Sequence, residues 1–268
     1  MIRLTDISYH IGNRTILDRV SFSAHPGTFL AILGANGAGK STLLKIARGE
    51  LHPPQGKVSI EGRPLREWKQ RDLAQCTAVL QQQTILTLPF PVHEVVMMGR
   101  YPHFKNIPTP LDHTIVKSAL RKAGIEHLAE RNYLELSGGE QQRVHLARVF
   151  AQVWFAEKYQ TRYLLMDEPG NNLDISHQHN VLDMAKAFAA EGNCVVAILH
   201  DLNLALQYAD KILLLHKGRV LAEGAPETAL NDENLSQAFD FPMTIHYSDA
   251  FEYPVILPVV QRQQTFAT

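Results

Sequence analysis

The sequence has few cysteines, no long apolar run and almost no net charge. Its two cysteines, Cys76 and Cys194, stand far apart in unlike contexts. This excludes a disulfide framework or a cysteine-based zinc site and indicates a reducing compartment, with both residues ordinarily buried. No run reaches membrane-spanning length, and residues 1–6 lack the charged-then-apolar pattern of a signal peptide. We therefore expect a cytoplasmic chain that works at a membrane only by docking on another protein.

The charge balance gives no reason to expect a nucleic-acid partner. The 268 residues carry 26 Lys and Arg against 27 Asp and Glu, a formal net charge of −1. The global basic excess that is typical of nucleic-acid binding is missing. With 45% hydrophobic residues, the chain can bury a substantial core as one large domain or a domain with an inserted subdomain.

The most informative segment is a glycine-rich loop at residues 34–42, between the apolar run 29–33 and a helical pattern. The strand, loop and helix order is the context in which G-x-x-x-x-G-K-[ST] binds nucleotide phosphates; a glycine turn before an ordinary helix is the alternative. Its glycines let backbone N–H groups point inward, and the helix adds its positive dipole end. We predict that Lys40 reaches the β- and γ-phosphates and that Ser41 binds Mg²⁺. The other predicted phosphate-loop residues are Gly34, Ala35, Asn36, Gly37, Ala38, Gly39 and Thr42.

Two further motifs follow in order. Residues 136–143 read L-S-G-G-E-Q-Q-R, and residues 163–169 read Y-L-L-M-D-E-P. A phosphate loop, then L-S-G-G-[QE], then an apolar strand ending in Asp-Glu resembles the ATP-binding-cassette (ABC) ATPases, from about Ile2 to about Gly224. The resemblance implies ATPase activity with ATP and Mg²⁺.

The resemblance also implies an α/β fold in which a phosphate-loop ATPase core carries an N-terminal antiparallel β layer. We expect this ABC ATPase domain at 1–224, with a helical subdomain inserted at about 84–155 and a C-terminal appendage at 225–268. Alternating apolar residues predict strands at 2–9, 15–24, 57–60 and 76–80, and a helix is expected around 64–74. Apolar residues at helical spacing predict helices at 92–99, 112–123, 140–153 and 231–238.

The L-S-G-G-E signature precedes the last helix of the inserted subdomain. The backbone N–H groups of Ser137, Gly138 and Gly139 are therefore expected at a positive helix end, which suits a second phosphate contact. In isolation, the two glycines would fit an ordinary loop before a helix. The family resemblance implies a head-to-tail homodimer, in which Ser137 and Gly139 of one protomer cap the γ-phosphate held by Lys40 of the other. Gly138 and Glu140 complete the signature that is contributed in trans.

Asp167 and Glu168 end an apolar strand, where side chains point into the crevice at the carboxyl edge of an α/β sheet. Such a pair is often a solvated turn. With the other motifs present, we predict that Asp167 binds Mg²⁺, as in other phosphate-loop ATPases, and that Glu168 orients the attacking water. His200 follows the apolar run 195–199. A lone histidine there is more often structural, but the resemblance places it against the γ-phosphate.

Three more site residues come mainly from the resemblance. Tyr9 is either a half-buried strand aromatic or, as the family implies, an adenine-stacking ring. The family places a glutamine that reaches Mg²⁺ and the attacking water at the end of the 76–80 strand. This favours Gln82, although three consecutive glutamines leave the register open by one, and Gln81 stands where proline is common. Asp174 is the candidate for communication across the dimer, although Gly170 replaces the usual threonine or serine.

The arrangement of the chain resembles a bacterial importer subunit. Exporters often fuse the cassette to membrane helices, repair ATPases insert a coiled coil, and translation factors usually carry two cassettes. This sequence reads as a single compact cassette with none of these features. The resemblance thus implies a peripheral protein at the cytoplasmic face of the inner membrane, with two copies of a multi-span permease and a separate substrate-binding protein. A soluble ATPase acting on nucleic acid or ribosomes is the alternative from another class.

Finer resemblance concerns the substrate. Residues 89–100 resemble importers for ferric siderophores, cobalamin and heme, and are expected to form part of a groove for a permease helix. Segments 99–103, 147–154 and 173–179 look like those of heme-importer ATPases, with siderophore and cobalamin as the alternatives. His177 and His179 lie two apart on a predicted helix and do not share a face. We therefore expect them at a surface or interface, not as heme ligands.

Overall fold

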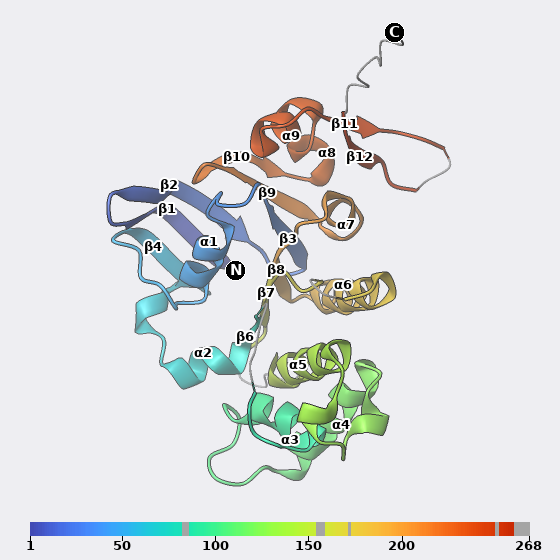
Figure 1. Ribbon diagram of the computed structural model, residues 1–268. Helices are drawn as coiled ribbons and strands as arrows, with labels where there is room; N and C mark the ends of the chain where they lie inside the picture. Colours follow the sequence, from blue (N-terminus) through green and yellow to red (C-terminus); the bar gives the residue numbers. More distant parts are fainter. Residues whose placement is uncertain (82–85, 154–158, 171–172, 250–251, 260–268) are drawn as a thin grey trace.

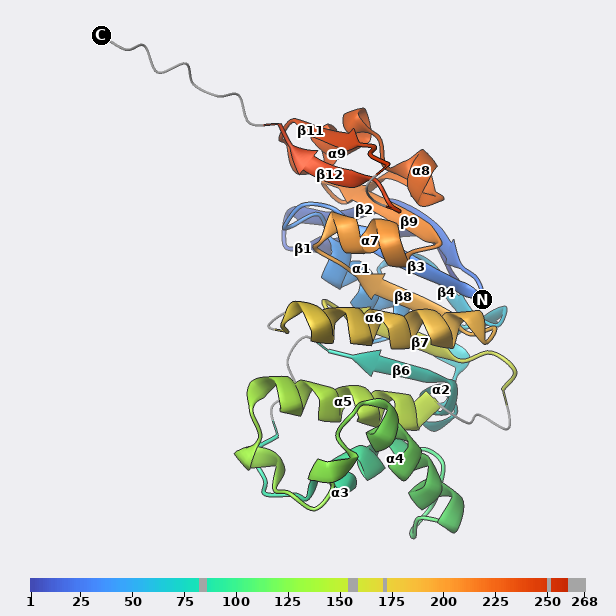
Figure 2. The same cartoon turned by 90° about the vertical axis from the view of Figure 1, so that its right-hand side faces the viewer.

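Two β-sheets pack against each other, and helices cover the opposite face of the larger sheet (Figures 1 and 2). This computed structural model describes residues 1–81, 86–153, 159–170, 173–249 and 252–259. A helical subdomain lies at one end of the molecule and the C-terminal elements lie at the other (Figure 1). The ATPase-like α/β fold predicted from the sequence is confirmed by these two sheets.

The smaller sheet is antiparallel, in the order β2-β1-β4-β5. Its strands are β1 (Ile2–Ile11), β2 (Arg14–Ala24), β4 (Gln55–Ile60) and β5 (Arg63–Pro64). β1 and β2, both predicted as strands, form a hairpin in which Tyr9 pairs with Leu17. Buried and exposed residues alternate over much of β1, as expected for a strand with one face on a core.

The helix predicted around 64–74 is wrong in its first half. Residues 63–64 form β5, a short 3-10 turn covers Leu65–Glu67, and α2 begins only at Gln70 (Gln70–Cys76). Trp68 and Lys69, between the two, have extended backbones. Trp68 packs against the core beneath the small sheet. We attribute the break to this packing, which outweighs a weak local preference for helix.

The larger sheet has the order β10-β9-β3-β8-β7-β6, and only β10 runs antiparallel to its neighbour. Its strands are β3 (Thr28–Leu33), β6 (Thr77–Leu80), β7 (Tyr163–Asp167), β8 (Cys194–Ile198), β9 (Lys211–His216) and β10 (Arg219–Gly224). The parallel strands are nearly continuous apolar runs because both of their faces are covered. Their carboxyl ends meet at one edge, where the phosphate loop, the Asp-Glu pair and His200 follow.

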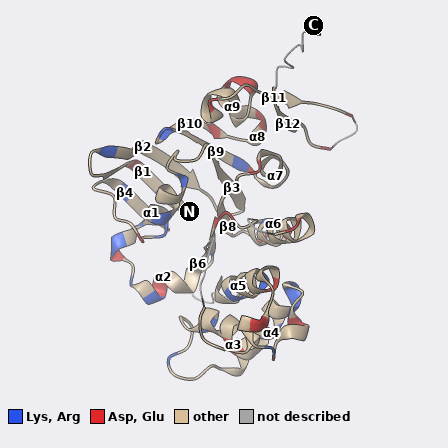
Figure 3. Cartoon of the chain, viewed as in Figure 1, with Lys and Arg blue, Asp and Glu red and all other residues tan. Residues whose placement is uncertain are grey.

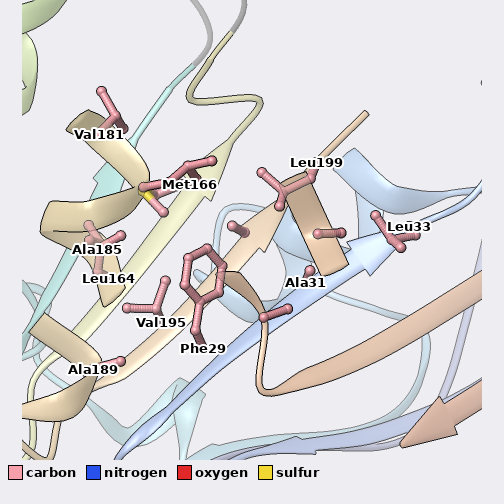
Figure 4. Packing of buried hydrophobic residues seen from close by; sticks show 14 of the residues in the cluster. Phe29, Ala31, Leu33, Leu164, Met166, Val181, Ala185, Ala189, Val195 and Leu199 are labelled. Carbon is pink, nitrogen blue, oxygen red and sulfur yellow. The ribbon is translucent and has the colours of Figure 1, made fainter. Parts of the chain in front are cut away.

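Each face of the larger sheet has its own hydrophobic core. Between the sheets, α1 (Lys40–Ala47) packs with residues such as Leu30 and Ile32 of β3. On the other face, α6 (Ile175–Ala190) covers Phe29 and Leu164, with α7 (Leu202–Tyr208) beside it (Figures 2 and 4). Alternate residues of β3 therefore support opposite cores, which fixes the direction in which the loop leaves the strand.

The helical subdomain has a third core, formed by α3 (Val92–Met97), α4 (Pro110–Lys122) and α5 (Gly138–Val153). These confirm the three predicted helices. A 3-10 turn, Met98–Arg100, extends α3, and further turns cover Glu126–Leu128 and Tyr133–Glu135. A Cβ on Gly99 would lie 2.1 Å from the Arg148 carbonyl oxygen, so only glycine fits. Buried Arg100 donates to Asp112 at 2.9 Å and to the Ala151 carbonyl at 2.8 Å, which ties α4 to α5.

The C-terminal elements pack on the strands β9 and β10. They are α8 (Pro226–Ala229), the predicted helix α9 (Asp232–Phe239) and a hairpin of β11 (Met243–His246) and β12 (Val255–Pro258). Leu235 and Ala238 join the core under α6. The Asn203 side chain of α7 accepts from the backbone N–H of Ile256 at 2.8 Å and donates to its carbonyl at 3.5 Å. The sequence predicted neither α8 nor the hairpin.

Both cysteines are buried and free, as expected. Burial raises the pKa of Cys76 to about 11 and that of Cys194 to about 12. Both are therefore protonated, unreactive thiols at neutral pH. Within the described ranges, none of the helices combines the length and apolar character needed to span a bilayer.

Candidate functional site

The glycine-rich loop joins the end of β3 to the start of α1, as predicted. Gly34 has φ +143°, and a Cβ there would lie 2.3 Å from the Leu215 carbonyl oxygen of β9. Gly39 has φ +101°, and its Cβ would lie 2.9 Å from the Ile16 carbonyl oxygen. Both positions require glycine for conformation and for space. The loop is thereby held against both sheets, while Asn36 and Gly37 at its tip are exposed.

Lys40 lies inside its own loop. Its side chain is buried, and Nζ donates to the carbonyl oxygens of Gly34 at 2.7 Å and Ala35 at 3.0 Å. Burial lowers the pKa of Lys40, against the opposing effect of the nearby Glu168 and Asp167 carboxylates. The ammonium group thus stands where the curled backbone could receive an anion, and its bonds keep the loop in shape.

Asp167 ends β7, and an oxygen of its carboxylate lacks a partner. Asp167 Oδ1 is buried and makes no hydrogen bond within the described part of the chain. Burial raises the pKa of Asp167, and the neighbouring Glu168 raises it further, while Arg48 and Lys45 of α1 and His200 oppose the shift. The unpartnered oxygen belongs to a carboxylate that also acts on Lys40, the first residue of α1, and it is a hard-oxygen donor of the kind Mg²⁺ prefers. The residues present therefore fit a magnesium ion.

Glu168 and His200 meet at the carboxyl edge of the sheet. Their atoms Oε1 and Nε2 are 2.5 Å apart, and the Glu168 side chain is only 14% exposed against 40% for His200. Glu168 has φ +52°, a left-handed conformation that is costly for a residue with a side chain. Its backbone N–H donates to the Ile198 carbonyl at 3.2 Å, which anchors the strained turn to β8. The structure thus joins two residues that the sequence assigned separately.

The signature forms a capping box at the start of α5. The backbone N–H and the hydroxyl of Ser137 each donate to Glu140 Oε2 at 2.8 Å, and the Glu140 N–H donates back at 3.4 Å. These bonds, foremost that of the Ser137 hydroxyl, lower the pKa of Glu140. A Cβ on Gly138 or Gly139 would meet nothing within 4 Å, so the surface over both glycines is open.

The signature and the phosphate loop belong to different parts of the chain. α5 belongs to the helical subdomain, whereas α1 lies between the two sheets (Figure 1). The structure therefore gathers the phosphate loop, Asp167, Glu168 and His200 at one sheet edge, and places Ser137 and its neighbours with the other lobe.

The remaining predicted residues have varied surroundings. Tyr9 is half-buried on β1 and packs against the core between the sheets, which leaves both readings of its role open. Asp174 is the N-cap of α6 and accepts from the His177 N–H at 2.9 Å. Gln82 lies outside the described residues. His177 and His179 are half-buried and each bonds inside the chain, so neither is a fully exposed residue.

Two groups that contact these residues or the segments next to them were not predicted from the sequence. Lys45 and Arg48 place positive charge toward Asp167, and their spacing from Ser41 along α1 was the available signal. The other group links α5 to the segment after Glu168. Gln142 Nε2 donates to the Pro169 carbonyl at 3.0 Å, and Arg143 Nη1 contacts His177 Nε2 at 2.9 Å.

Comparisons with known proteins agree with this geometry. The family described as "ABC transporter" matches residues 17–171. The hemin import ATP-binding protein HmuV of Gloeobacter violaceus is 44% identical over 259 residues, which are 97% of this chain and 94% of that protein. The protein of the same name from Bordetella avium is 46% identical over 239 residues, covering 89% of this chain and 91% of the relative.

Solved structures give the same result. One, assigned to a metal-chelate type ABC transporter in an inward-facing conformation, has a TM-score of 0.80 at 28% identity and covers 97% of this chain and 98% of its own. A dimeric ATP-binding cassette in a post-hydrolysis state with ADP and Pi has a TM-score of 0.72 at 25% identity, covering 84% and 99%. The chain therefore belongs to the ABC transporter family and is one of its ATP-binding cassettes, which bind and hydrolyse ATP.

Proposed function

We propose that this chain is the ATP-hydrolysing subunit of a bacterial importer for heme (hemin). It would act as a homodimer on two copies of a multi-span permease, supplied by a separate substrate-binding protein, at the cytoplasmic face of the inner membrane. The assignment of heme as the substrate rests on one observation. Proteins named for hemin import are 44–46% identical to this chain over about nine-tenths of its length or more.

In this proposal the phosphate loop binds the triphosphate of ATP. The Lys40 ammonium leaves the carbonyls of its loop for the β- and γ-phosphates, and loop N–H groups donate to the same anion. Ser41, Asp167 and Gln82 would hold Mg²⁺, which offsets charge on the phosphates when bound. Tyr9 would stack on the adenine.

Hydrolysis would depend on positioning, because phosphoryl transfer passes through a loose transition state that needs little covalent chemistry from the protein. Glu168 accepts a hydrogen bond from the attacking water and holds it in line with the γ-phosphate. His200 would contact the γ-phosphate. The 2.5 Å contact between its Nε2 atom and Glu168 Oε1 holds the two side chains in a fixed relative position. The strained backbone of Glu168 aims its side chain at the crevice.

The second half of each site would come from the other protomer. Ser137, Gly138 and Gly139 would cap the γ-phosphate across a head-to-tail interface, with Glu140 as the neighbouring residue of the same signature. The open space over both glycines supports this, since no described part of their own chain lies close enough to require glycine at either position. In the present conformation Ser137 donates to Glu140, so closure of the dimer would exchange that acceptor for phosphate. Asp174 would contact the other protomer when the dimer closes and so link the two ATP sites.

Permease docking is supported by exposed apolar side chains on the helical subdomain. Leu88, Tyr101 and Ile107 are 58%, 57% and 78% exposed, all in the segment around α3. Three large exposed apolar side chains within one short segment suit a protein interface. This segment includes residues 89–100, for which the sequence predicted a permease groove. We retain the proposed boundaries of 1–224 for the ATPase domain, about 84–155 for the subdomain and 225–268 for the appendage.

Charge supports a protein partner over a nucleic acid. Basic and acidic segments are interspersed on both lobes in the view of Figure 3, and the formal net charge is −1. A nucleic-acid-binding protein typically concentrates Lys and Arg on one face. The alternative function to be tested is a soluble ATPase that acts on nucleic acid or ribosomes. Within the importer function, ferric siderophore and cobalamin are the alternative substrates.

The test is ATP-driven uptake into proteoliposomes that contain this subunit and its co-purified permease. Heme, cobalamin and a ferric siderophore are offered in parallel, each with its binding protein. We expect uptake of heme alone, abolished by Glu168→Gln. Uptake of another substrate would refute heme but keep the importer, and failure to recover any permease would favour the soluble alternative.

A further inference from the structure

A chain of three polar side chains joins α5 to the start of α6. Arg143 Nη1 lies 2.9 Å from His177 Nε2, and His177 Nδ1 lies 2.6 Å from Asp174 Oδ1. A guanidinium group can only donate, so Nε2 must be the acceptor and carries no proton. The proton of the neutral ring is then on Nδ1, from which it is donated to Asp174. The contacts thus specify one tautomer of His177.

The ring is not needed to cap α6. The capping bond to Asp174 comes from the backbone N–H of His177 at 2.9 Å, which any residue except proline would supply. The Nδ1 contact adds a second bond to the same oxygen, which also accepts from the Ser176 hydroxyl at 3.1 Å. Together these donors fix the orientation of the Asp174 carboxylate.

Arg143 depends on the same contact. Its Nε atom is buried without a hydrogen-bond partner in the described part of the chain, so the bond to His177 directs the guanidinium. Arg143 is on the first turns of α5, a few residues after Ser137 and next to Gln142, which donates to the Pro169 carbonyl at 3.0 Å. The helix that starts at the signature is therefore bonded twice to the segment that follows Glu168.

We propose that His177 is a positioning residue that couples the signature helix to Asp174. This inference rests on the proposed function, in which the signature and Asp174 meet the other protomer. When Ser137 engages phosphate and α5 shifts, Arg143 carries the shift to His177, and His177 carries it to the carboxylate of Asp174. Phosphate contact at one site then sets the orientation of the side chain that faces the partner.

The first measurement is the imidazole ¹⁵N spectrum of the full chain without nucleotide, with His177 assigned by His177→Gln. We expect a neutral ring protonated on Nδ1. Arg143→Met should shift the Nε2 resonance, because that atom loses its donor, while Nδ1 keeps the proton that it donates to Asp174. A ring protonated on Nε2 would overturn the proposal. His179→Gln is the matched control, because His179 lies on the same helix and bonds Tyr208 instead.

The second measurement is a double-mutant cycle on ATP hydrolysis. His177→Ala and Arg143→Met should each lower kcat about tenfold, the size of one lost charge-assisted hydrogen bond, with ATP affinity unchanged. Because the side chains act as one unit, the double variant should be no slower than either single variant. Additive losses, or a loss in affinity instead of kcat, would refute the coupling. If Glu168→Gln hydrolyses ATP normally, the proposed function fails instead, whatever the tautomer.

Discussion

Replacing Asp167 by asparagine should make the metal-free protein more stable while it removes activity. The wild-type residue is half-buried, its carboxylate has a buried oxygen that makes no hydrogen bond in the described part of the chain, and it lies next to Glu168. Asparagine has nearly the same shape but no charge. Leaving a buried polar group unsatisfied costs about 1–3 kcal/mol, and the residual exposure of the side chain places this site at the low end.

We therefore expect Asp167→Asn to raise the free energy of unfolding by about 1 kcal/mol in EDTA at pH 7.5. For a chain of this size this corresponds to roughly 2–4 °C in Tm. With Mg²⁺ and ATP the order should invert, because ligand binding stabilises the wild type and the variant lacks a metal ligand. Hydrolysis should fall about a hundredfold or more.

The pH dependence has a definite sign. The folded pKa of Asp167 is raised, by burial and then by Glu168, so the folded state binds the proton more tightly than the unfolded state. The wild type therefore gains stability relative to the variant as pH falls from 7.5 through the raised pKa. The Tm difference in EDTA should shrink over this window.

The assay is thermal unfolding followed by calorimetry, with phosphate release measured on the same samples. Asp249→Asn, at an exposed position, is the control and should change neither quantity. A less stable Asp167→Asn variant in EDTA, or one that hydrolyses ATP normally, would refute the reasoning about this carboxylate.

Three further predictions follow from the same geometry. Glu168→Gln should bind ATP normally and lower kcat about 10²–10⁴-fold, measured by nucleotide fluorescence and phosphate release; normal turnover would contradict its assignment. Gly34→Ala should destabilise the fold by about 2 kcal/mol or more in urea unfolding, because its Cβ would lie 2.3 Å from the Leu215 carbonyl; an unchanged midpoint would count against it. Glu140→Gln frees Ser137 and removes a charge that repels phosphate. In the Glu168→Gln background, dimerisation followed by gel filtration should therefore need about threefold less ATP. A higher ATP requirement would be evidence against the exchange of Glu140 for phosphate as the acceptor of the Ser137 hydroxyl.

The sequence predicted the site best where spacing and order carry the information. Gly34, Lys40 and Glu168 stand in contiguous motifs on the elements expected for them, because an apolar run followed by such motifs leaves few alternatives. Packing between distant segments was not predictable. Trp68 interrupts a helix to reach the core, and no local pattern signals that demand.

Hydrogen bonds between side chains on different helices also could not be predicted from the sequence. His177 was predicted only to lie at a surface or interface, whereas its ring bonds Arg143 thirty-four residues away along the chain. The orientation of such a ring depends on the crossing of α5 and α6, which the hydrophobic pattern of either helix does not specify.

The position of Lys40 has a consequence for which nucleotides the empty site accepts. An incoming ligand must first detach the ammonium from the carbonyls of Gly34 and Ala35, at 2.7 and 3.0 Å. A di- or triphosphate supplies anionic oxygens that replace both acceptors, but a nucleoside or monophosphate that fails to reach the loop leaves the exchange uncompensated. The lysine thus acts as a built-in competitor, and AMP and adenosine should be excluded by the loop itself, before any contact with the base is tested.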